Sequence, residues 1–147
     1  MKKILILAGV VAVTASVPAA ANAQSTPLAS RMQITTTMNG MHAVPHGDMH
    51  GTGRATISLY PMANKVCYAM TIKGVMGNAL AAHIHKGAIG KAGPVFITVG
   101  TPGKNGRTVG CTKAKTSMIR AIMTNPRGYY VNVHTKEYPA GAIRGQL

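Results

Sequence analysis

The sequence predicts an all-β fold, an antiparallel sandwich or barrel with one short helix. Segments rich in β-branched and apolar residues recur about every 10 to 15 residues, and Gly, Pro and Asn separate them, as is typical of antiparallel sheets. Only one stretch, in the C-terminal third, has apolar residues at helical spacing. The chain has 147 residues, within the range of one domain with a single hydrophobic core.

Turn residues divide the chain into seven expected strands. Gly, Pro and Asn gather at Tyr60 to Asn64, Gly87 to Gly93 and Pro102 to Gly106, where we expect turns. The expected strands are Arg31–Met38, Thr52–Tyr60, Lys65–Lys73, Ala79–His85, Pro94–Val99, Gly128–His134 and Ala142–Leu147.

Alternation along the strands predicts which side chains form the core, because successive residues of a strand point to opposite faces. In the strand Lys65–Lys73, the expected core residues are Val66, Tyr68, Met70 and Ile72, and the outward residues are Cys67, Ala69, Thr71 and Lys73. In the strands beginning at Ala79 and Gly128, the expected core residues are Leu80, Ala82, Ile84, Tyr129, Val131 and Val133. The histidines of these two strands are then expected on the outer face.

The segment Thr116 to Thr124 breaks the alternation. Its apolar residues Met118, Ile119, Ile122 and Met123 recur at helical spacing, and Pro126 follows, which is typical of a helix that ends there. We expect one short helix that caps the sheet.

The N-terminus has the features of a cleavable signal peptide. Lys2 and Lys3 precede an apolar run of about 14 residues, which is too short to cross a bilayer as a helix. Ala21-Asn22-Ala23 supplies the small residues of a cleavage site, so we expect residues 1–23 to be removed and the chain to be periplasmic or secreted. An uncleaved anchor is the alternative. No second long apolar run follows, so the mature chain is not expected to be an integral membrane protein.

The chain is strongly basic, with 16 Lys and Arg against two acids, Asp48 and Glu137. The basic residues are scattered singly and lack interleaved aromatic residues, so no nucleic-acid partner is expected. An anionic envelope surface is a possible partner of this charge, and a solvated positive surface is the alternative. Hydrolase and phosphoryl-transfer activities are not expected. The chain has only two acids, and it has neither a nucleophile motif nor a phosphate-binding motif.

The two cysteines, Cys67 and Cys111, are expected to form one disulfide, because an exported chain folds in an oxidising compartment. A free thiol pair and a metal site are the alternatives.

Three groups of motifs resemble those of bacterial CHRD (chordin) domains. They are Ala81-Ala82-His83-Ile84-His85-Lys86-Gly87 with Gly90-Lys91-Ala92-Gly93-Pro94-Val95, then Tyr130-Val131-Asn132-Val133-His134-Thr135, then Tyr138-Pro139-Ala140-Gly141-Ala142-Ile143-Arg144-Gly145-Gln146. The resemblance covers about Met38 to Leu147, so we expect a CHRD domain at 38–147, preceded by an N-terminal segment with the first strand at 24–37. It implies an extracytoplasmic β-sandwich without an agreed activity. Where the family commonly carries glutamates, this chain has Ala43 and Ala142, so a role that needs those carboxylates is not expected.

Histidines form the main candidate site. His83 and His85 lie on the same face of one expected strand, about 6.6 Å apart, and His134 lies on the outer face of a later strand. If these strands are neighbours, three imidazoles converge in an arrangement that suits copper or zinc. The alternative is three hydrogen-bonded histidines that orient loops.

This arrangement is also similar to copper-zinc superoxide dismutase, a Greek-key fold whose copper site combines a His-x-His strand with a later Val-His strand. We therefore expect a Greek-key or immunoglobulin-like β-sandwich with one short helix. The stretch from Lys86 to Val133 contains neither the His nor the Asp of the dismutase zinc loop, which argues against dismutase activity.

A second candidate metal site is the loop from Met38 to His50, in which we expect a flexible Asp48. It carries three histidines and three methionines, a combination that copper, and Cu(I) above all, prefers, and a solvated loop is the alternative. These residues are His42, His46, His50, Met38, Met41 and Met49.

Together these features predict an exported, non-enzymatic CHRD-domain protein that binds a transition metal, copper or zinc, or an envelope component at its histidine-bearing face. A dismutase-like redox enzyme and a structural or adhesion module of the cell envelope are the alternatives.

Overall fold

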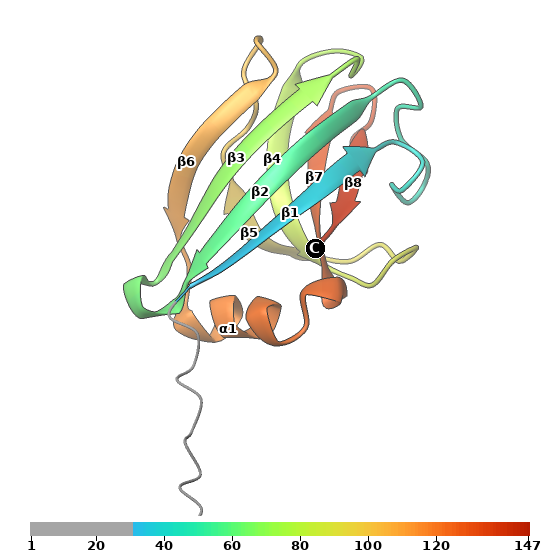
Figure 1. The fold of residues 1–147 in the computed structure, drawn as a ribbon. Coiled ribbons are helices and arrows are strands. Elements are labelled where there is room, and N and C mark those ends of the chain that lie inside the picture. Colours follow the sequence, from blue (N-terminus) through green and yellow to red (C-terminus); the bar gives the residue numbers. More distant parts are fainter. Residues whose placement is uncertain (1–30) are drawn as a thin grey trace, which may run out of the picture.

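The structure, a computed structural model, describes residues 31–147, so the expected signal peptide and half of the segment 24–37 lie outside the described residues. Eight strands and one α-helix make up the fold (Figure 1). The strands are β1 (Met32–Asn39), β2 (Thr52–Tyr60), β3 (Lys65–Lys73), β4 (Ala79–Lys86), β5 (Val95–Val99), β6 (Arg107–Lys113), β7 (Tyr129–Thr135) and β8 (Ile143–Gln146). The helix is α1 (Thr116–Thr124), and two 3-10 turns, Pro61–Ala63 and Pro126–Gly128, precede β3 and β7.

All eight strands belong to one antiparallel sheet with the order β5-β4-β7-β8-β1-β2-β3-β6. The two edge strands, β5 and β6, approach each other, so the sheet curls almost into a barrel. With this closure, the consecutive strands β4, β5 and β6 lie side by side in that order. The next strand, β7, returns to pair with β4, which is a Greek-key connection. The all-β class with one short helix is confirmed. A single curled sheet takes the place of the two separate sheets of an immunoglobulin-like sandwich.

Alternation and turn residues located seven of the eight strands to within two residues at each end, but β6 was not predicted. Its only large apolar side chain, Val109, is 81% exposed, so the strand has no apolar face that a sequence pattern could reveal. Pairing with β3 places it in the sheet. Glycine at position 110 leaves room for the Tyr68 side chain of the paired strand. A Cβ atom at Gly110 would lie 2.7 Å from the Tyr68 hydroxyl oxygen.

The core lies inside the curl of the sheet, and the expected core residues of β3 and β7 face it. Leu80 was predicted to be buried but is 65% exposed. The pairing of β4 with β7 shifts between Ala79 and Ala81, so Leu80 is the extra residue of a bulge and points to solvent. The residues that are fully inaccessible in the core are Ala55, Ile57, Leu59, Val66, Ala82, Ile84, Ile119, Ile122, Val131, Val133 and Ile143.

Helix α1 lies across one end of the curled sheet (Figure 1). Its bounds are those predicted, and Ile119 and Ile122 are completely buried against the core. Asn125 and Pro126 follow the helix and end it. The helix therefore closes this end of the curled sheet and contributes two side chains to the core.

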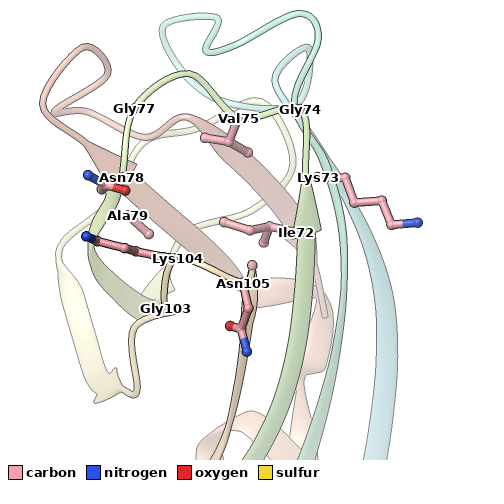
Figure 2. Close-up of a pocket in the computed structure, with 11 residues that line it drawn as sticks. Ile72, Lys73, Gly74, Val75, Gly77, Asn78, Ala79, Gly103, Lys104 and Asn105 are labelled. Carbon is pink, nitrogen blue, oxygen red and sulfur yellow. The ribbon is translucent and has the colours of Figure 1, made fainter.

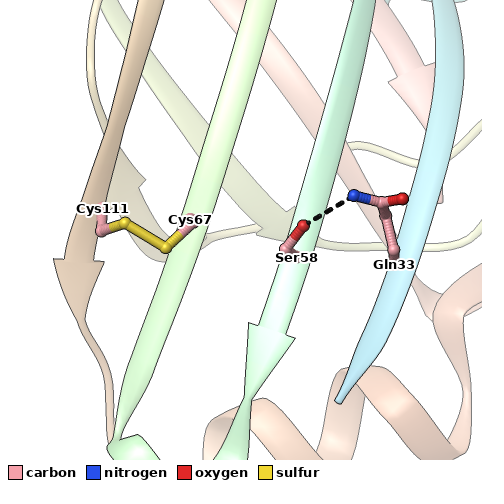
Figure 3. The surroundings of a disulfide bond; sticks show 4 residues. All are labelled: Gln33, Ser58, Cys67 and Cys111. Atoms are coloured by element: carbon pink, nitrogen blue, oxygen red, sulfur yellow. Dashed lines mark hydrogen bonds between the residues drawn. A yellow bond between two sulfur atoms is a disulfide. The ribbon is translucent and has the colours of Figure 1, made fainter.

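The two cysteines lie on the outer face of the sheet, in register on β3 and β6. The structure bonds Cys67 to Cys111, with 2.10 Å between the sulfur atoms. The same row continues across β2 and β1, where the Gln33 side-chain amide donates a hydrogen bond of 3.0 Å to the Ser58 hydroxyl (Figure 3). A covalent bond and a hydrogen bond thus cross-link two pairs of neighbouring strands along one row.

Candidate functional site

Three histidines from two neighbouring strands form a compact cluster on the outer face of the sheet. Strand β4 carries His83 and His85, and β7 carries His134; the two strands pair directly, with Ala81 opposite His134. One ligand nitrogen from each histidine lies within 4.8 Å of the others. The structure therefore brings together the three residues that the sequence singled out, which we call the histidine cluster.

Hydrogen bonds determine which nitrogen atoms of the cluster are free. Nδ1 of His85 lies 2.9 Å from the Gly93 carbonyl oxygen, and Nδ1 of His134 lies 2.9 Å from the Pro139 carbonyl oxygen. A carbonyl oxygen only accepts, so both Nδ1 atoms donate, and in neutral rings both Nε2 atoms carry a lone pair. These two Nε2 atoms lie 3.3 Å apart. Nδ1 of His83 is buried and has no hydrogen-bond partner.

The cluster lies on the face opposite to the core, as expected, but it is less open than an outer face usually is. His85 is only 7% exposed, and His83 and His134 are half-buried. Burial lowers the pKa of His83, and the neighbouring His134 and His85 lower it further. Burial is also the main cause of the lowered pKa of His85; the Gly93 carbonyl opposes it, and His134 and Arg144 add to it. The neutral form of the His83 and His85 imidazoles therefore predominates at pH 7.

Tyr130 packs on the cluster and Arg144 packs on Tyr130; neither was predicted as a site residue. The Tyr130 ring stacks on His85 with centroids 4.9 Å apart and 8° between the planes. The Arg144 guanidinium carbon lies 3.5 Å from the centroid of Tyr130 on β7. Both residues occur in the motifs that resemble CHRD domains, which was the only sequence signal for them. The stack Arg144–Tyr130–His85 restricts the motion of the His85 ring.

The loop between β4 and β5 is held against this stack. Arg144 donates to the carbonyl oxygens of Lys91 and Ala88, at 2.8 and 2.7 Å. The Gly93 amide donates to the Tyr130 hydroxyl at 3.1 Å. A side chain at Gly93 would collide with the backbone, because a Cβ atom would lie 1.7 Å from the Lys86 carbonyl oxygen. The loop can therefore approach β4 closely only because residue 93 is glycine. This approach brings the Gly93 carbonyl oxygen within hydrogen-bond distance of His85.

The histidines of the loop between β1 and β2 do not join the cluster. Within residues 31–147, the histidine cluster is the only group of three or more His, Cys, Asp or Glu side chains that could share a metal ion. Nδ1 of His46 lies 2.9 Å from the Met41 carbonyl oxygen. Met38 was expected both at the end of the first strand and as a possible ligand in this loop; it belongs to β1 and is buried in the core, because it lies on the inward face of that strand.

Asp48 was expected in a flexible part of the same loop, but it is 2% exposed and hydrogen-bonded. Its carboxylate accepts the backbone N–H groups of Met76 and His50, at 2.6 and 3.0 Å. Burial raises the pKa of Asp48, but the N–H donors of Met76, His50 and Gly51 together lower it below its ordinary value. Asp48 therefore joins two loops, and neither it nor the exposed Glu137 belongs to the histidine cluster.

A separate cavity of about 220 Å³ lies between the end of β3 and the loop that precedes β6. Figure 2 shows Lys73 pointing away from the other lining side chains. None of the predicted metal ligands lines this cavity, so it is a feature distinct from the histidine cluster.

The cluster offers three imidazole nitrogen donors. Such donors suit zinc and copper, and three protein ligands leave coordination positions for water or a substrate. Tetrahedral bonds of about 2.05 Å would place two ligand nitrogens about 3.3 Å apart, close to the 3.3 Å between the Nε2 atoms of His85 and His134.

No helix in the described part of the chain is long and apolar enough to cross a membrane. Comparison with curated proteins found no match. Comparison with solved structures found none either. The family described as CHRD domain matches residues 34–147, a span that includes all but the first two residues of β1, every later strand of the described chain, the helix and all three histidines of the cluster. From the match over this span, we conclude that the chain belongs to the CHRD-domain family.

Proposed function

We propose that this CHRD domain is a binding protein for a transition-metal ion, copper or zinc, held by His83, His85 and His134. Membership of the CHRD family suggests a binding module. The observation that supports a metal most directly is the 3.3 Å distance between the Nε2 atoms of His85 and His134. Both rings donate from Nδ1 to a carbonyl oxygen, so two lone pairs face each other unless a cation lies between them.

A proton on His85 is a poor candidate for that cation at neutral pH. The pKa of His85 is lowered by burial, and the positive charge of Arg144 lowers it further. A metal ion forms covalent coordination bonds with imidazole, and its ligands commonly donate their second ring N–H to a backbone carbonyl. Both Nε2 ligands show that pattern, and the orphaned Nδ1 of His83 is a third available donor.

Metal titrations of the mature chain test this proposal. Protein treated with a chelator and then freed of it is titrated with Cu(II) or Zn(II) by calorimetry with a competing ligand. We expect one ion per chain. The double variant His83→Gln/His85→Gln should lose at least about a hundredfold in affinity, because replacing even a residue that only orients a metal ligand costs about 10- to 100-fold.

The matched control removes two histidines from the loop between β1 and β2. His42→Gln/His46→Gln has the same change in composition and lies outside the cluster. It should bind Cu(II) or Zn(II) with nearly the affinity of the unmodified chain. Equal losses in the two double variants, or unchanged binding in His83→Gln/His85→Gln, would rule out the cluster as the metal site.

We also propose that the chain is exported after cleavage behind Ala23. Support comes from the basic start, the short apolar run and the Ala21-Asn22-Ala23 sequence, together with two cysteines at bonding distance. Intact-mass measurement of protein from its native host should give a chain that begins at Gln24 and gains the mass of two hydrogen atoms on reduction. A chain that still carries Lys2, or one whose mass does not change on reduction, would contradict the respective half of the proposal.

A further inference from the structure

A small cavity of about 120 Å³ lies beside the first and last strands, β1 and β8, which are paired at Asn39 and Arg144. One residue from each of the loops that follow β1 and β4 completes its lining. The cavity is lined by Thr36, Thr37, His42, Ile89, Arg144 and Gln146. It is large enough for more than one water molecule, since about 10–15 Å³ on this scale holds one.

Arg144 brings a buried positive charge to the wall of this cavity. Its side chain is 2% exposed. Its hydrogen-bond partners are the carbonyl oxygens of Lys91 and Ala88 and the side-chain oxygen of Gln146, and its face lies on the Tyr130 ring. All of these groups are neutral. A buried guanidinium is normally paired with an acid, because desolvation of an unpaired charge is costly.

Neither of the two acids of the chain is bonded to Arg144. The Asp48 carboxylate accepts two backbone N–H groups, and Glu137 is exposed next to Gly77. Burial lowers the pKa of Arg144, and the only opposing influence is Tyr130, so no carboxylate compensates for the desolvation. The positive charge at the cavity wall therefore lacks an anionic partner among the described residues.

The remaining groups of the wall are suited to an anion. A guanidinium has five N–H donors, and the bonds to Lys91, Ala88 and Gln146 account for three of the five on Arg144. Thr37 also lines the cavity and has a hydroxyl group that can donate, whereas the Thr36 hydroxyl already donates to the Thr37 carbonyl oxygen at 3.2 Å. Gln146 is already occupied, because its amide nitrogen donates to backbone carbonyl oxygens, which keeps its oxygen directed at Arg144.

We propose that the cavity between β1 and β8 is a binding site for a small oxyanion, a carboxylate or phosphate group, held by Arg144. The planar guanidinium matches the geometry of such groups. The large excess of Lys and Arg over acids raises the local concentration of anions around the chain. None of the three histidines of the cluster lines this cavity, so the two candidate sites are distinct.

Anion titrations of metal-free protein test the inference independently of the metal site. The probes are sodium acetate and inorganic phosphate, titrated against sodium chloride at constant ionic strength. The readout is the chemical shift of the Arg144 side-chain Nε–H group and of the Thr36 and Thr37 amides. We expect saturable shifts at these groups with at least one of the two oxyanions and none with chloride.

Because Arg144 is buried and its replacement could unfold the domain, the variant is made at the exposed rim. Ile89→Asp places a carboxylate beside the cavity, and Val109→Asp makes the same change on the distant strand β6; both parent side chains are largely exposed. Like-charge repulsion should weaken acetate or phosphate binding at least about tenfold in Ile89→Asp and leave Val109→Asp within about twofold of the unmodified chain. No saturable shift in the unmodified chain, or equal weakening in both variants, would overturn the inference.

Discussion

Replacing Asp48 by Ala should destabilise the domain, although the residue is in a loop. The carboxylate accepts two backbone N–H groups, from Met76 at 2.6 Å and from His50 at 3.0 Å, and it is almost completely buried. Hydrogen bonds to a charged group contribute about 1.5–3 kcal/mol each. Because Met76 is exposed and water can replace part of its bond, we expect a loss near the lower end of the sum, about 3 kcal/mol.

Urea denaturation at pH 7 measures this loss, and Glu137→Ala is the matched control. Glu137 is the other acid of the chain and is exposed, so its removal changes the net charge equally and should alter the free energy of unfolding by at most about 0.5 kcal/mol. An Asp48→Ala variant within about 0.5 kcal/mol of the unmodified protein would refute the reasoning. So would an equal loss in Glu137→Ala, because the effect would then come from net charge.

The pH dependence gives a second check on Asp48. Its pKa in the folded chain is below the ordinary value of 3.8, so the unfolded chain binds the proton first as the pH falls. The stabilisation by Asp48 is therefore complete well above pH 3.8 and is lost as the pH falls through the folded pKa. The difference in unfolding free energy between Asp48→Ala and the unmodified chain should be constant near neutral pH and narrow below pH 3.8.

Two further predictions concern stability. Gly110→Ala should cost about 1–3 kcal/mol in urea denaturation, because its Cβ atom would lie 2.7 Å from the Tyr68 hydroxyl, whereas Val109→Ala on the solvent side should have little effect. Metal-free protein should lose stability as the pH falls below 6.5, since the pKa values of His83 and His85 are lowered in the folded chain and the unfolded chain takes up protons first. Thermal unfolding in a pH series measures how the stability falls with pH. The fall should be shallower in His83→Gln/His85→Gln, and an identical fall would contradict the lowered pKa values of the two histidines.

Local sequence patterns determined most of the secondary structure. Period-two alternation in Lys65–Lys73 placed Val66 and Met70 in the core, and helical spacing gave the bounds of α1. The same alternation placed His83 and His85 on one face of β4. These predictions depend only on the backbone geometry of neighbouring residues, which the sequence itself encodes. Where the local pattern was weak, as in β6 with its exposed Val109, the strand was missed.

Tertiary structure decided everything that joins distant segments. The sequence could place His134 on an outer face but could not show that β7 lies beside β4, because strand order depends on how the whole sheet closes. A bulge, which adds one residue to β4, turned Leu80 to solvent, and hydrogen bonds across two loops buried Asp48. The packing of Tyr130 on the histidine cluster and of Arg144 on Tyr130 likewise comes from three strands that meet only in the folded sheet. Sequence alone therefore determined the elements and the faces of their side chains, while contacts between elements decided which side chains meet and how deeply they are buried.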